Sequence, residues 1–114
     1  MKIVEQLLIN SEEDTKLLIQ NDSHGDKFSV PRTVDFTINA SDEEKAELVA
    51  SFIEDNHYGK TTVTKVDEVF RISVFVEMPI EQNIICSVSG LMLCVSELFN
   101  VDYDGWGCIM QNKA

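Results

Sequence analysis

The sequence predicts an α+β fold in which an additional N-terminal helix precedes a ferredoxin-like split βαββαβ unit. Three observations support this prediction: an alternating apolar segment precedes an amphipathic one, two strand-like segments flank a short polar link, and a long apolar helical pattern leads into a last strand-like segment. This order gives a four-stranded antiparallel sheet with two helices on one face. We take residues 1–114 as one domain, with the N-terminal helix at 1–21 and the βαββαβ core at 31–110.

The first segment, 2–20, has the periodicity of a helix. Ile3, Val4, Leu7 and Leu8 form an apolar stripe that Leu17 and Leu18 resume. Ser11 is followed by Asp14 three residues later, which is a helix-capping pattern, so we expect the helix to break or restart there. Asp14 and the two acids before it would then be solvated cap residues. Gly25 suits the left-handed conformation that ends a helix.

The next two elements form the first βα unit. After Pro31, segment 33–39 alternates and places Val34, Phe36 and Ile38 on one face, as in a half-buried strand. Segment 41–56 then begins with a capping box of Ser41 and Glu44. The predicted core face of this helix consists of Ala46, Val49, Ala50 and Ile53.

The second half begins with two strands, 60–66 and 69–77, joined as a hairpin. A second long helix follows Pro79, with an apolar row of Ile84, Val88, Leu91, Val95 and Leu98 and with Ile85, Met92 and Phe99 beside it. Gly90 lowers the helical propensity there, which indicates close packing against a neighbour. The chain then enters a last strand within 101–110.

Composition limits the classes of partner. The net charge is −11, from 20 acidic and nine basic residues, so nucleic acids and anionic membranes would be repelled and a basic partner favoured. No apolar run approaches the roughly 18 residues of a membrane span, and the N-terminus does not have the pattern of a signal peptide. These features predict a cytoplasmic protein with reduced thiols.

The sequence predicts no catalytic residues, metal site or cofactor. His24 and His57 lie far apart in loop-like segments, without the spacing of metal ligands. Each cysteine lies in a segment with core character, and the three are Cys86, Cys94 and Cys108. The strand at 69–77 lacks the Gly-aromatic pairs of RNA-recognition modules, so direct RNA binding is not expected. We therefore do not expect an enzyme.

The segment VDYDGWG, at 101–107, has two interpretations. In the first, the glycines permit a bulge and the tryptophan packs locally. In the second, aromatic side chains among carboxylates anchor a basic partner. The candidate partner-binding residues are Asp102, Tyr103, Asp104 and Trp106, with Gly105 and Gly107 as motif glycines. Both interpretations stay open from the sequence.

The longer string FNVDYDGWG, at 99–107, resembles the signature ending of the regulator of ribonuclease E activity B family. EEDTKLLI at 12–19 is similar to the N-terminal helix of that family, and 30–59 is similar to its first strand and helix. The resemblance implies a ferredoxin-like fold and a non-enzymatic inhibitor of ribonuclease E. It also implies binding to the Arg-rich C-terminal region of the nuclease, which would modulate RNA decay.

Well-known members carry a long acidic tail after this strand, whereas CIMQNKA follows Gly107 here. If that tail drives binding, we expect weaker binding by this chain. The alternative function is an acidic interaction domain that neutralises another basic partner, such as a toxin. The exposed edges of a split βαββαβ sheet also leave room for a homodimer.

Overall fold

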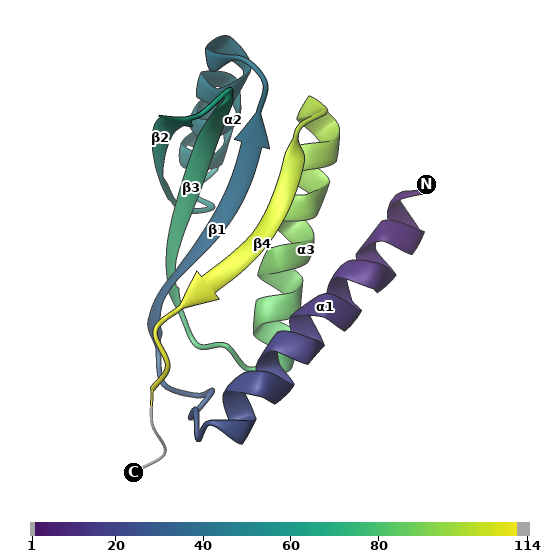
Figure 1. The fold of residues 1–114 in the computed structure, drawn as a ribbon, viewed down its shortest axis with the longest axis vertical. Coiled ribbons are helices and arrows are strands. Elements are labelled where there is room, and N and C mark those ends of the chain that lie inside the picture. Colours follow the sequence, from purple (N-terminus) through teal and green to yellow (C-terminus); the bar gives the residue numbers. More distant parts are fainter. Residues whose placement is uncertain (1, 112–114) are drawn as a thin grey trace.

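The computed structural model describes residues 2–111 and contains three helices and four strands (Figure 1). The elements in chain order are α1 (Ile3–Ser23), β1 (Arg32–Ala40), α2 (Glu43–Asp55), β2 (Lys60–Val66), β3 (Val69–Met78), α3 (Gln82–Phe99) and β4 (Asp102–Cys108). The predicted helix followed by βαββαβ is confirmed.

The four strands form one sheet in the order β2-β3-β1-β4, and every neighbouring pair is antiparallel. Helices α2 and α3 pack on the same face (Figure 1). The predicted alternation of β1 is confirmed, because Val34, Phe36 and Ile38 are fully buried beneath these helices. Their partners on β3 include Val74 and Ile72, so the core lies between the two central strands and the helices.

Helix α1 is continuous, so the expected break near Ser11 is wrong. Asp14 is not a solvated cap residue either, since it lies inside the helix and is 4% exposed. The helix packs along α3 and does not cover the open face of the sheet (Figure 1). The packing predicted from Gly90 is confirmed, because Leu7 Cδ2 lies 3.4 Å from where a Cβ on Gly90 would stand.

The residue that caps the N-terminus of α2 differs from the predicted one. Asp42 is the capping residue, and its Oδ1 accepts a hydrogen bond of 2.8 Å from the backbone N–H of Lys45. Ser41 precedes it and is exposed, so the predicted capping box of Ser41 and Glu44 is wrong. Both residues are good caps, and the position at which β1 ends decides between them. The predicted core face is confirmed in full: Ala46, Val49, Ala50 and Ile53.

The apolar face predicted for α3 is confirmed in part, and its buried centre lies on residues beside the main predicted row. Its most deeply buried residues are Ile85, Ser89, Met92, Val95 and Ser96, while Ile84, Val88 and Leu91 of the predicted row are partly buried and pack against the core. Leu98, the last residue of the predicted apolar row, is 74% exposed. The helix contacts the sheet on one side and α1 on another, which brings two serines inside. The hydroxyl of Ser96 is satisfied there, because it donates to the carbonyl of Met92 at 2.9 Å.

By length and composition alone, α3 could also cross a membrane, contrary to the expectation that no segment approaches a span. A single such helix is weak evidence, because core helices pass the same test. In this structure α3 packs against the sheet and α1.

A buried ion pair joins the end of α1 to the start of β1. Arg32 Nη1 lies 2.8 Å from each carboxylate oxygen of Asp26, and the two side chains are 2% and 0% exposed. Asn21 and the backbone N–H of Gln111 also donate to Asp26. The rest of the guanidinium donates to backbone carbonyls, including that of Lys27 at 2.7 Å. Both charges are therefore compensated within the fold.

Candidate functional site

Strand β4 contains a β-bulge at its centre. Tyr103 pairs with Ile38 of β1 and Trp106 pairs with Phe36, so β4 carries two residues where β1 carries one. Gly105 lies in the bulge with φ +89°, a conformation that residues with a Cβ rarely adopt. In a regular strand, residues three apart point to opposite faces. The bulge instead turns both Tyr103 and Trp106 toward the helices.

The two aromatic side chains tie three elements together through hydrogen bonds. Trp106 Nε1 donates to Asp14 Oδ1 of α1 at 2.9 Å. The hydroxyl of Tyr103 lies 2.8 Å from Ser89 Oγ of α3, and Asn10 of α1 donates to the same Ser89 oxygen at 3.1 Å. The position of α1 therefore depends partly on this polar contact with β4.

A cleft of about 360 Å³ opens beside these contacts, and we refer to it as the β4 cleft. Its lining comes from α1 and β4: Asn10, Glu13, Asp14, Leu17, Tyr103, Asp104, Gly105 and Trp106. Glu13 and Asp104 are exposed, whereas Tyr103 and Trp106 are partly exposed. The cleft thus combines three carboxylates with two aromatic rings.

Among the residues that line this cleft, Asp14 is unusual because its carboxylate is buried and incompletely hydrogen-bonded. Its Oδ1 is bound by Trp106, but its Oδ2 is buried and has no hydrogen-bond partner within residues 2–111. Burial raises the pKa of Asp14, while the nearby Ser89 hydroxyl and the Trp106 indole act in the opposite direction. Burial also raises the pKa of Tyr103, which keeps the phenol neutral.

A second acidic feature lies where β1 ends. Asn39 pairs with Asp102 of β4, and Ala40 pairs with Phe70 of β3, so the connections into α2, β3 and β4 meet at one end of the sheet. We define the acidic end as six exposed residues there: Asp42, Glu43, Glu44, Asp67, Glu68 and Asp102. Within 2–111 none of these carboxylates forms an ion pair, although Lys45 lies on α2, and Lys65 and Arg71 lie on the strands that flank the turn at 67–68.

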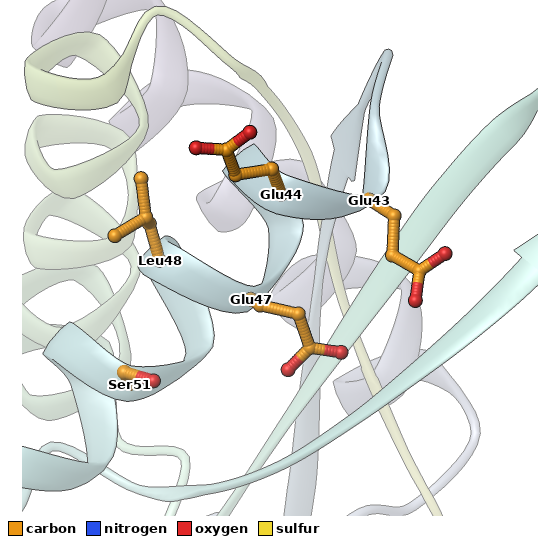
Figure 2. A pocket seen from close by; sticks show the side chains of 5 residues that line it. All are labelled: Glu43, Glu44, Glu47, Leu48 and Ser51. Atoms are coloured by element: carbon orange, nitrogen blue, oxygen red, sulfur yellow. The ribbon is translucent and has the colours of Figure 1, made fainter.

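The acidic end continues onto the outer surface of α2. Figure 2 shows Glu43 and Glu47 on one side of this helix, and Glu44 with Leu48 on the other. With Ser51 they line an open hollow of about 490 Å³. Leu48 is 55% exposed among these glutamates, which gives the acidic surface one apolar contact point.

The predicted site residues separate into two places. Asp102 belongs to the acidic end, whereas Asp104 lines the β4 cleft. Tyr103, Gly105 and Trp106 line that cleft as well. Gly107 faces β1, where a Cβ would lie 3.3 Å from Asp35 Oδ1.

Sequence reasoning missed Asn10, Asp14 and Ser89 as members of this site. One signal for Asp14 was present, because it lies seven residues after Leu7 and four before Leu18, on the inward stripe of α1.

The part of the chain that the structure describes holds no group of three or more His, Cys, Asp or Glu that could bind a metal ion. The three cysteines are free and partly buried. Burial raises the pKa of Cys86 and of Cys108, which disfavours the reactive thiolate. The arrangement therefore offers charged and aromatic contacts rather than a nucleophile.

Comparison with protein-family models identifies the family to which this chain is related. A family model described as regulator of ribonuclease activity B matches residues 11–108, which include the bulge, the β4 cleft residues from Glu13 onward and the whole acidic end. The chain belongs to this family. RraB proteins are non-enzymatic regulators that inhibit ribonuclease E, and the family and function expected from the sequence are thereby confirmed. A comparison with curated protein sequences gave no significant match.

Proposed function

We propose that this RraB-family chain inhibits ribonuclease E by binding an Arg- and Lys-rich segment in the C-terminal region of the nuclease. The observation that carries the proposal is the acidic end, where six exposed carboxylates come together without ion-pair partners in the described residues. Like charges held close together destabilise the free protein, and a basic segment would relieve that repulsion. The net charge of −11 favours the same kind of partner.

The affinity of this contact depends on the number of ion pairs that form. An exposed ion pair contributes about 1 kcal/mol or less, so a useful affinity requires several pairs at once. Six carboxylates at one end of the sheet supply that number, and Leu48 adds an apolar contact beside them. Charge complementarity would also accelerate association, and salt would weaken both effects.

The proposed inhibition depends on RNA being the other ligand of the basic segment. Lys- and Arg-rich segments hold RNA by neutralising its phosphates. A protein that covers such a segment competes with RNA and slows its decay. The proposal includes a cytoplasmic site of action for this chain. Membership of the RraB family favours this partner over a toxin. One copy of the chain supplies the whole acidic end, so the proposal does not require a homodimer.

The test compares two triple variants that remove the same charge. The first removes three acids of the acidic end: Glu43→Gln, Glu44→Gln and Glu68→Gln. The control removes three exposed acids elsewhere: Glu12→Gln, Asp55→Asn and Glu81→Gln.

We expect the first variant to bind the C-terminal region of ribonuclease E at least tenfold more weakly than the control, because three ion pairs are lost at about 0.5 kcal/mol or more each. A kinetic binding assay on the surface-immobilised nuclease segment measures the association rate and the dissociation rate. Equal weakening by the two variants would contradict a localised acidic contact, and unchanged binding by both would contradict the electrostatic mechanism.

A further inference from the structure

We propose that the β4 cleft receives one arginine side chain of the partner. Its guanidinium would lie between Glu13 and Asp104 at the mouth, stack on Trp106 and approach the buried carboxylate of Asp14. This inference rests on the proposed function, because it names the type of partner residue and a contact separate from the acidic end.

The first support is the incomplete hydrogen bonding of Asp14. Its side chain is 4% exposed and lines the cleft, yet Oδ2 has no partner within the described part of the chain. Buried polar atoms in folded proteins nearly always have a partner, and an exception calls for an explanation. A cationic hydrogen-bond donor that enters the cleft and displaces the side chains covering Oδ2 would satisfy this oxygen.

The second support is the size and charge of the cleft. A volume of about 360 Å³ suits one long side chain better than a folded segment. Glu13 of this cleft is paired with Lys16, whose Nζ lies 3.4 Å from Glu13 Oε1. Both side chains of that pair are at least 65% exposed, so the contact is weak and an incoming charge can replace it. Three carboxylates then face one bound cation.

The third support is the chemistry of the aromatic wall. Trp106 is held by its hydrogen bond to Asp14 and by the bulge at Gly105, so its ring is oriented before a partner arrives. A guanidinium is planar, stacks on an indole face and donates two parallel hydrogen bonds to a carboxylate. An ammonium group lacks that planar geometry, so the cleft should prefer arginine to lysine.

The test uses a short probe without tryptophan, acetyl-Arg-Gly-Arg-Gly-Arg-amide, with the matching lysine peptide for comparison. Trp106 is the only tryptophan of the chain, so its indole N–H gives a single, local NMR signal. We expect the arginine peptide to shift this signal in a saturable manner and at lower concentration than the lysine peptide. An indole signal that stays unmoved up to millimolar peptide would overturn the proposal.

Two matched variants test the role of Asp14. Asp14→Asn keeps an acceptor for Trp106 but removes the charge, whereas Glu12→Gln removes a charge from the exposed side of the same helix. We expect Asp14→Asn to weaken peptide binding roughly tenfold or more, as for the loss of one hydrogen bond to a charged group, and Glu12→Gln to change it less than twofold. Equal effects would overturn the assignment to the cleft.

The same signal separates failure of this inference from failure of the proposed function. If the nuclease segment binds without moving the indole resonance, the proposed function stands and the arginine site is wrong. If the peptide enters the cleft while the nuclease segment does not bind, the arginine site stands and the proposed partner is wrong.

Discussion

Asp26 and Asp14 are both buried carboxylates, but the fold compensates only one of them. Asp26 has Arg32 within 2.8 Å of both oxygens and two further donors, whereas Asp14 has one hydrogen bond and a buried oxygen without a partner in residues 2–111. The first carboxylate has its counter-charge built in and holds three chain segments together. The second lies beside a cleft, which suits a counter-charge supplied from outside. Burial alone therefore does not distinguish a compensated carboxylate from an uncompensated one.

The largest effect is expected at the compensated pair. Arg32→Met leaves Asp26 buried without its counter-charge, so the free energy of unfolding should fall by about 3–5 kcal/mol. Urea denaturation measures this value. Arg71→Met is the matched control, because Arg71 is exposed and its loss should change stability by about 0.5 kcal/mol or less. Equal losses in the two variants would show that the buried pair contributes little to the fold.

An intermediate effect is expected at the single hydrogen bond of Asp14. Trp106→Phe keeps an aromatic ring in the bulge but removes the N–H that donates to Asp14, leaving both carboxylate oxygens without that donor. Stability should fall by about 1–3 kcal/mol, and the pKa of Asp14 should rise further because the lost bond favoured the charged form. Denaturation and carboxyl ¹³C NMR measure the two quantities. An unchanged pKa would mean that this hydrogen bond does not tune the carboxylate.

The smallest effect concerns pH. Burial raises the pKa of Asp14 in the folded chain above its unfolded value of about 3.9. The group therefore binds its proton more tightly when folded, and its contribution to stability is present at low pH and is lost as pH rises through the folded pKa. Asp14→Asn should accordingly gain stability relative to the parent chain between pH 4 and pH 7.

Melting temperatures of the two proteins across this range test the sign of the pH effect. A relative loss of stability in Asp14→Asn with rising pH would mean that the carboxylate is better compensated than its surroundings indicate. Such a result would remove the contrast with Asp26.

The element order could be predicted from sequence because it depends on local periodicity. The alternation around Phe36 and the helical stripe through Ile53 are visible in short windows, and both residues are fully buried as expected. The two glycines of the VDYDGWG segment likewise indicated a bulge from the sequence, as one of two interpretations. The glycine at 105 does adopt the positive φ that a bulge uses.

The buried serines of α3 and the role of Asp14 could not be predicted in the same way. Asp14 follows a local pattern that resembles a cap, and its partner Trp106 lies 92 residues later in the chain. Ser89 lies on the buried face of α3 between Ile85 and Met92, where Tyr103 and Asn10 hydrogen-bond its hydroxyl. Tertiary contacts of this kind override local preference, and a single sequence does not display them.

The most direct test of the central claim is calorimetric titration of this chain with the Arg-rich C-terminal region of ribonuclease E at two salt concentrations. An acidic regulator that binds through exposed carboxylates should bind tightly at low salt and lose affinity steeply at physiological salt, since the screening length falls to about 8 Å. Absence of binding at low salt, or an affinity unchanged between the two conditions, would contradict the account.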